Sequence, residues 1–185
     1  MQACKAGYIP AHVHDAMINR MTREELDEII QSLEQTPTEV SLLLDQISPH
    51  EQRIRNADEF SALENICHLR DIEIEGYTKR ILQILQDDIP SLADIDGGRL
   101  ALERDYNNQD ASQALEAFTT ARKRNIEQLR RVSPEQTARE GNLEGVGVIS
   151  LAKLLEMMLE HDQGHLIELS VIQRRSQIKK EASSL

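Results

Sequence analysis

The chain has 185 residues and a net charge of −11, with 39% hydrophobic and 29% charged residues, which indicates one helical or mixed domain with a single core. An acidic chain without tryptophan and with 3% aromatic residues lacks the basic surface and stacking platforms of nucleic-acid-binding proteins. No segment approaches the roughly 20 apolar residues that span a bilayer, and two cysteines are too few for a disulfide framework. We therefore expect a cytoplasmic protein that binds neither nucleic acid nor membrane.

The first twenty residues show no apolar periodicity, and a helix-start signal follows them directly. Thr22 with Glu25 forms a capping box, in which each side chain is expected to bond to the other residue's backbone N–H. We therefore predict a flexible N-terminal extension over residues 1–20, a helical domain over 21–178 and a C-terminal tail over 179–185.

Two further start signals predict the next helices. The segment "TPTEVSLLLDQIS" places Thr36 as an N-cap and Pro37 at the first helical position, which predicts that the first helix is interrupted there. A third capping box, Ser61 with Glu64, is expected to begin a long helix that runs through Gln86.

A connection follows over residues 87–110. It carries Pro90 and the pair Gly97-Gly98, which indicates a crossover loop. Helical periodicity resumes over about 110–132 and again over about 150–177, and "EGNLEGVGV" between them is expected to be a loop. Strand signals are nearly absent. The sequence therefore predicts an all-α protein, a four-helix bundle with one long crossover connection.

The last predicted helix carries polar residues on its apolar side. His161 and His165 lie four residues apart, so both rings project from one face, and Asp162 shares that face with several leucines. Buried polar groups need partners. Two neutral imidazoles suit a divalent metal ion, but hydrogen bonds to other side chains or to backbone carbonyls would also satisfy them. The residues alone leave both interpretations open.

A third metal ligand would have to come from another helix, and His68 is the candidate. It is turned by roughly 145° from the main apolar stripe of its helix, although it shares a side with Leu69 and Ile72. Periodicity therefore leaves the third ligand unsettled.

Arg122 falls on the predicted inner face of the third long helix. One interpretation is a buried ion pair with Asp71, Glu73 or Asp162. The other is a clamp for an anionic group of a substrate, because a guanidinium binds such groups through two parallel hydrogen bonds.

Three segments resemble the DinB/YfiT-like superfamily, and they occur in the same order. "FSALENICHLRDIE" is similar to the second helix of that family, in which a capping serine precedes a His-Leu pair. "DYNNQDASQALEAFTTARKRNIEQLRRV" is similar to its third helix, and "GVISLAKLLEMMLEHDQGHLIEL" to its fourth, with an H-D-x-x-H motif. Phe60 stands where the family usually has tryptophan. The resemblance covers about residues 22 to 175.

The resemblance implies an up-down-down-up four-helix bundle that holds a divalent metal ion, either zinc, nickel, iron or manganese. His68, His161 and His165 match the three histidine ligands of the family. Arg122 and Asp162 are further candidates, as residues that bind substrate.

The activity that the resemblance implies is that of a metal-dependent enzyme acting on a small-molecule substrate. This would be a hydrolase or a thiol S-transferase, the latter with a low-molecular-weight thiol as cosubstrate. One alternative is a metal-binding domain without catalysis. Another is a metal-free interaction bundle that dimerises through apolar residues outside the main stripes, such as Leu82 and Ile167. In each case a homodimer is expected.

Overall fold

The computed structural model describes residues 20–57 and 59–182. The predicted extension over residues 1–20 therefore lies almost wholly outside the described residues. The long elements are α2 (Arg23–Leu44), α3 (Ala62–Asp71), α4 (Thr78–Gln86), α6 (Ala111–Leu129) and α7 (Leu151–Ala182). The short ones are η1 (Glu51–Arg53), η3 (Tyr106–Asn108), η4 (Pro134–Ala138), α5 (Gly97–Glu103), β1 (Ser91–Leu92), β2 (Glu140–Leu143) and β3 (Gly147–Ser150).

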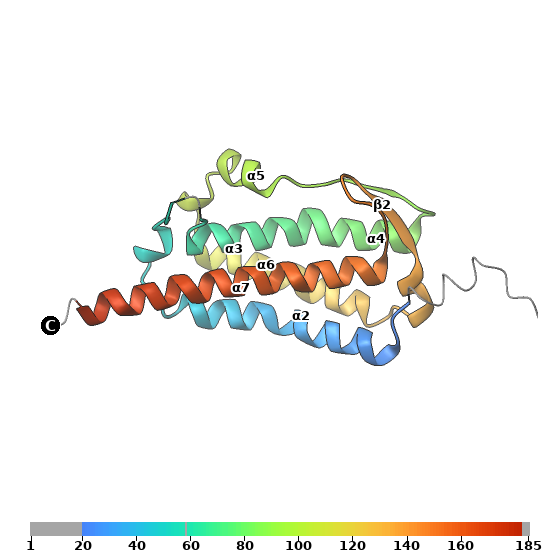
Figure 1. The fold of residues 1–185 in the computed structure, drawn as a ribbon, viewed down its shortest axis with the longest axis horizontal. Helices are drawn as coiled ribbons and strands as arrows, with labels where there is room; N and C mark the ends of the chain where they lie inside the picture. Colours follow the sequence, from blue (N-terminus) through green and yellow to red (C-terminus); the bar gives the residue numbers. More distant parts are fainter. Residues whose placement is uncertain (1–19, 58, 183–185) are drawn as a thin grey trace, which may run out of the picture.

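A π-helical segment, η2 (Ile72–Tyr77), joins α3 to α4, so these three elements form one long helix. Figure 1 shows α2 and α7 running in one direction, and α3–η2–α4 and α6 in the other. The connection between the two parallel helices returns along the bundle and contains α5. The predicted four-helix bundle with an up-down-down-up order and a long crossover is therefore confirmed.

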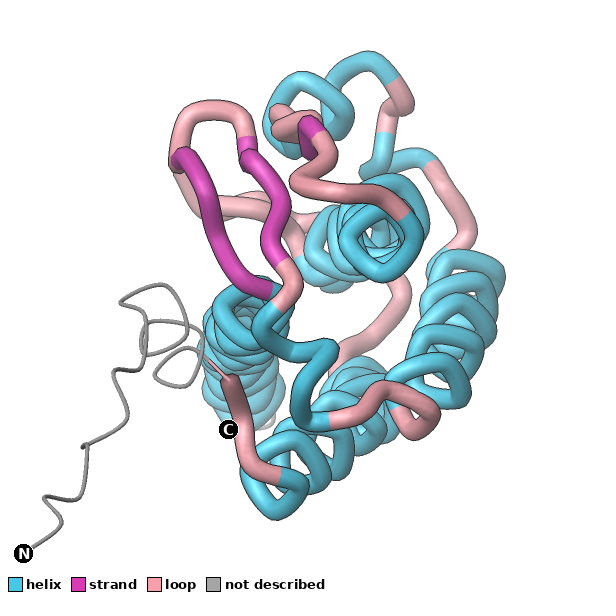
Figure 2. Tube along the Cα trace, turned by 90° about the vertical axis from the view of Figure 1, so that its right-hand side faces the viewer, coloured by secondary structure: helices cyan, strands magenta, loops and turns pink. Residues whose placement is uncertain are grey.

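The four long helices enclose a common interior, which is seen nearly end-on in Figure 2. Contacts join α2 to α6 and α7, and α3 to the same two helices, so α6 and α7 lie diagonally across the bundle from each other. The apolar core is divided into two clusters along the bundle axis. On α2, for example, Leu33 belongs to one cluster and Val40 to the other. A layer of polar residues lies between them.

The three short strands form a small sheet at one end of the bundle (Figure 2), in the order β1-β2-β3. Strands β2 and β3 form an antiparallel hairpin in which Glu140 pairs with Ser150. The prediction of a loop for "EGNLEGVGV" was wrong here, because strands of four residues are too short to show a period of two. Gly145 lies in the turn between them and Gly147 begins β3; both have positive φ, a conformation that glycine adopts without steric cost.

The first long helix is continuous, and the predicted interruption at Thr36 was wrong. Pro37 lies inside α2 and has no N–H to donate to the carbonyl of Leu33, four residues earlier. That carbonyl instead accepts a hydrogen bond of 2.8 Å from Nη1 of Arg122 on α6. The Thr36 hydroxyl does not cap a helix but donates to Oδ2 of Asp162 at 2.8 Å. A side chain from another helix thus replaces the bond that proline removes.

The last helix extends to Ala182, beyond the end predicted near residue 177. Ile167 on this helix is 64% exposed, whereas Leu82 on α4 is partly buried, and the homodimer stays a prediction. Within the described part of the chain, no helix combines the length and apolar character needed to cross a membrane.

A first prediction concerns the bond between Thr36 and Asp162. Replacing Thr36 with Val keeps the shape of the side chain but removes a hydrogen bond to a buried carboxylate, so the free energy of unfolding should fall by about 1–3 kcal/mol. The matched control is Thr119→Val on α6, where the exposed hydroxyl donates only to the carbonyl of Leu115 in its own helix. That variant should change the free energy by less than about 0.5 kcal/mol. Urea unfolding measures both, and equal effects would contradict the role given to Thr36.

Candidate metal centre

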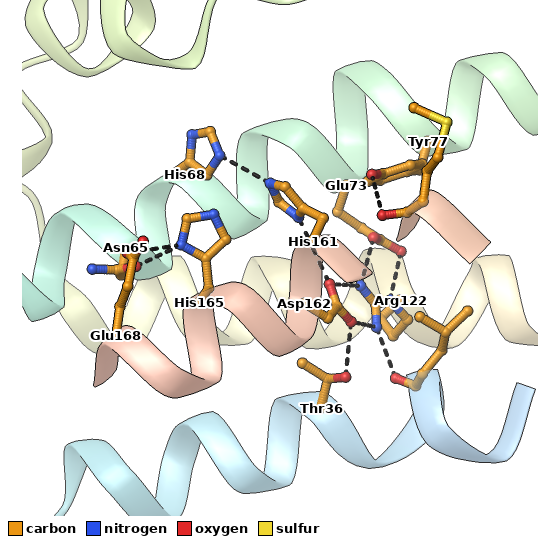
Figure 3. A network of polar contacts seen from close by, with 12 residues as sticks. Thr36, Asn65, His68, Glu73, Tyr77, Arg122, His161, Asp162, His165 and Glu168 are labelled. Carbon is orange, nitrogen blue, oxygen red and sulfur yellow. Dashed lines mark hydrogen bonds and ion pairs between the residues drawn. The ribbon is translucent and has the colours of Figure 1, made fainter. Parts of the chain in front are cut away.

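Three histidines from two helices converge in the polar layer of the bundle. One ring nitrogen from each of His68 on α3 and His161 and His165 on α7 lies within 4.8 Å of the other two. Nε2 of His68 is 3.0 Å from Nε2 of His161. Figure 3 shows the three rings facing one another between α3 and α7. We call these three residues the histidine cluster.

The placement of His68 resolves the question that helical periodicity left open. The side of α3 that carries His68 faces α7, a second neighbour in the bundle, and the ring is partly buried there. A residue far from the main apolar stripe can therefore still point toward a partner helix. The structure thus brings together the three histidines that the family resemblance identified.

The orientation of His165 is fixed by its neighbours. Its Nδ1 lies 2.6 Å from Oδ1 of Asn65 and 3.3 Å from Oε2 of Glu168. The amide group of Asn65 is itself oriented, because Nδ2 donates to the carbonyl of Ser61 at 3.1 Å. Both oxygens can only accept, so Nδ1 of His165 carries the proton, and the lone pair of Nε2 faces the other two rings.

The other two rings each have a nitrogen without a hydrogen-bond partner. Nδ1 of His68 and Nδ1 of His161 are buried, and no hydrogen bond to either is found among the described residues. Nδ1 of His161 lies 3.9 Å from Oδ1 of Asp162, beyond hydrogen-bonding distance. Unsatisfied buried nitrogens are uncommon in folded proteins, so the hydrogen bonds among the described residues do not account for these two atoms.

Burial keeps His68 and His165 neutral. Burial, followed by the nearby ring of His161, lowers the pKa of His68 to about 4. The same two causes, in the same order, lower the pKa of His165 to about 3. At neutral pH both imidazoles are therefore uncharged and have a lone pair available.

Beside the cluster, Arg122 on α6 forms a fully buried network across the bundle. Its Nε and Nη2 donate to the two carboxylate oxygens of Glu73, both at 2.9 Å. Nη1 and Nη2 donate to Asp162 at 2.6 and 3.1 Å, and Nη1 also donates to Leu33. All five N–H groups of the guanidinium are thus used. We call Arg122 with Glu73, Asp162 and the Leu33 carbonyl the Arg122 network.

This network bears out one of the two interpretations of Arg122, the buried ion pair. The ion pair with Glu73 and Asp162 is confirmed, whereas Asp71 binds Arg70 and Arg104 instead. Substrate binding by Arg122 and Asp162 stays a prediction, and neither the guanidinium nor the carboxylate has an exposed surface for it. Burial alone would raise the pKa of Asp162, but the charge of Arg122 and the hydrogen bonds to the carboxylate lower it below its usual range.

The π-helical segment η2 was not predicted. It contains Glu73, which binds Arg122, and Tyr77, whose ring centroid is 5.9 Å from that of His161. A π-helical turn frequently marks a functional site in a longer helix. No residue pattern in "IEIEGY" distinguishes it from an ordinary helical turn, although an acidic residue directed toward the core at position 73 was a signal for a buried cation.

The crossover connection covers the outer side of His68. A Cβ atom added at Gly97 would lie 2.2 Å from Cε1 and 2.5 Å from Nδ1 of that ring, so the backbone of α5 touches the imidazole. The other end of α5 is held by Arg104, which binds Asp71 on α3 at 2.7 Å. The sequence indicated only a loop at Gly97-Gly98 and gave no sign of this contact.

The fold and the site together define a helical-bundle protein with a histidine cluster between its second and last long helices. The chain belongs to the DinB superfamily, whose family model matches residues 32–169. Among solved structures, YfiT from Bacillus subtilis is similar, with a TM-score of 0.78 and 20% sequence identity over 84% of this chain and 89% of that chain. That protein is described as a probable metal-dependent hydrolase with an unusual four-helix bundle topology. No curated protein matches this chain.

A second prediction tests the contact between α5 and the histidine cluster. Gly97→Ala should force the His68 ring to move, and should lower the free energy of unfolding by about 1–3 kcal/mol, the usual cost of overpacking. Gly98→Ala is the matched control. Its added Cβ would meet only Oδ1 of Asp96, at 3.5 Å, and alanine should stabilise the helix by up to about 1 kcal/mol.

Urea unfolding gives the stability, and the NMR signals of the His68 ring report its displacement. A Gly97→Ala variant as stable as Gly98→Ala, with unchanged His68 signals, would show that α5 does not constrain the ring.

Proposed function

We propose that this protein is a metal-dependent hydrolase in which His68, His161 and His165 bind one divalent ion. The observation that carries the proposal is the convergence of three ring nitrogens within 4.8 Å, next to two buried Nδ1 atoms that lack partners. Without a metal ion, His68 and His161 could share one hydrogen bond between their Nε2 atoms. That bond would leave the lone pair on Nε2 of His165 without a partner.

The donor set fits a divalent transition-metal ion. Neutral imidazole is a good ligand for zinc, nickel and iron, and burial keeps His68 and His165 neutral at physiological pH. When bound by three protein ligands, such an ion retains a position for water and makes that water more acidic. The similar fold of YfiT, described as a probable metal-dependent hydrolase, supports the same class of activity.

The chain's own residues prepare the cluster for this role. Asn65 holds the proton on Nδ1 of His165 and directs Nε2 toward the centre. Carboxamide or carboxylate groups behind a ligating histidine commonly fix its tautomer in this way. Asp162 stays ionised because Arg122 neutralises it, and its negative charge lies near the ring of His161. The ring of His165 is therefore oriented before any ligand arrives.

Hydrolysis is preferred to thiol transfer because of the charge beside the cluster. A thiol reacts as its anion, the thiolate. Among the described residues, the pocket that reaches His165 is lined by Glu168 and by Glu59, which Arg175 pairs from outside the lining, and by no lysine or arginine. An anionic cosubstrate would be repelled there, whereas water carries no charge. We therefore place hydrolysis first among the two reactions.

A third prediction tests the metal centre. Wild-type protein purified without chelators should contain about one divalent ion per chain. His68→Gln should weaken its binding by about a hundredfold or more, because even the loss of a residue that only hydrogen-bonds to a metal ligand costs about 10–100-fold. His50→Gln is the matched control, since His50 is exposed and lies outside the cluster. Elemental analysis and competition with a chromogenic chelator measure both.

Equal and negligible metal content in wild type and His68→Gln, after reloading under anaerobic conditions, would show that the cluster is not a metal site. If wild type binds metal but hydrolyses no member of a panel of small esters and amides, the proposal of a hydrolase fails. A metal-binding domain without catalysis would then be the better description.

A further inference from the structure

A pocket of 470 Å³ opens beside the histidine cluster, between the start of α3 and the outer part of α7. Its size lies in the range of small-molecule sites. Phe60, Val171 and Ile172 provide apolar walls, and His165 forms part of the lining. The charged residues of the lining are Glu59 and Glu168.

The pocket adjoins the histidine cluster. His165 belongs to both, and the ring centroid of Phe60 lies 5.5 Å from that of His68. A molecule bound against Phe60 is therefore next to two of the three histidines. Because a pocket with apolar walls and few polar groups is the usual form of a substrate site, this is the natural place for the substrate of the proposed hydrolase.

The two carboxylates of the pocket differ in their surroundings. Glu59 is neutralised by Arg175, whose Nη1 lies 2.7 Å from Oε2. Oε2 of Glu168 lies 3.3 Å from Nδ1 of His165, whose ring is neutral, and among residues 20–57 and 59–182 no lysine or arginine forms a salt bridge with this carboxylate. The pocket therefore has one carboxylate whose charge is not balanced by the protein.

The carboxylate of Glu168 also lies apart from the centre of the histidine cluster. Glu168 approaches the Nδ1 side of His165, whereas Nε2 faces the other two histidines (Figure 3). The imidazole ring lies between them, so a cation beside Glu168 would not occupy the space that a metal ion would take. The net charge of −11 further favours the approach of cations over anions.

We propose that this pocket binds a substrate with an apolar body and a positively charged nitrogen, such as an alkylammonium or arylalkylammonium group. Phe60, Val171 and Ile172 would contact the apolar body, and Glu168 the ammonium group. This assignment rests on the proposed function, since it names the class of substrate for the same site.

The fourth prediction is measured on metal-free protein, so that it does not depend on the metal centre. The chain has no tryptophan, and Phe60→Trp therefore introduces a single indole into the pocket. Hexylammonium, hexanol and hexanoate share one apolar body and differ in charge. Titrated against indole fluorescence, hexylammonium should bind about tenfold more tightly than hexanoate, because attraction of one and repulsion of the other by an exposed carboxylate each contribute about threefold.

Glu168→Gln in the same background should weaken hexylammonium binding about threefold and remove its advantage over hexanol. Glu156→Gln is the matched control, because it makes the same change of charge on α7 outside this pocket and should leave all three affinities unchanged. Methyl NMR signals of Val171 and Ile172 in the wild-type chain provide a second measurement that needs no indole. They should shift on addition of hexylammonium.

The substrate assignment is overturned if hexanoate binds as tightly as hexylammonium. It is overturned as well if Glu168→Gln still binds hexylammonium more tightly than hexanol. It is also overturned if neither the indole nor the methyl signals respond to any probe. A protein that prefers the ammonium but holds no metal would instead refute the proposed hydrolase and leave the pocket as a binding site.

Discussion

The guanidinium of Arg122 is 2% exposed, and all of its N–H groups are bonded to residues of three other elements. A buried charge is tolerated only when it is paired and hydrogen-bonded. Moving α2, η2 or α7 by one turn would leave a charge or a carbonyl unsatisfied between two apolar clusters. The alignment of the four helices therefore depends on this one side chain more than on the leucines around it, which can repack with similar neighbours.

That alignment is what creates the histidine cluster. Asp162 is adjacent to His161 in sequence and one turn from His165, so the bond from Arg122 to Asp162 also sets the register of both histidines against His68. Asn65 performs a similar task one turn before His68, by fixing the ring of His165 from α3. A site of three rings thus depends on two buried polar contacts, each made by a residue that is not part of the cluster.

The sequence predicted the features that depend on residues close together in the chain. It missed those that depend on contacts between distant residues. Capping boxes at Thr22 and Ser61 and the H-D-x-x-H spacing are local, and they correctly placed helices and the two histidines of α7. The family resemblance supplied His68, which periodicity could not. Pro37 was misread because the group that fills its missing bond is 85 residues away in sequence, on Arg122. Gly97 was read only as a loop residue, since its contact with His68 exists only in the folded bundle.

The bonds of Arg122 also affect how the bundle assembles, because they join residues that are far apart in the sequence. Arg122 is separated in sequence from Leu33, Glu73 and Asp162 by 89, 49 and 40 residues, so its bonds can close only after all four helices have met. Local helices can form earlier, because their contacts close only short loops. Interactions that are absent from the folding transition state slow unfolding without speeding folding. We therefore expect the Arg122 network to set the lifetime of the folded bundle, and with it the time for which the histidines stay aligned.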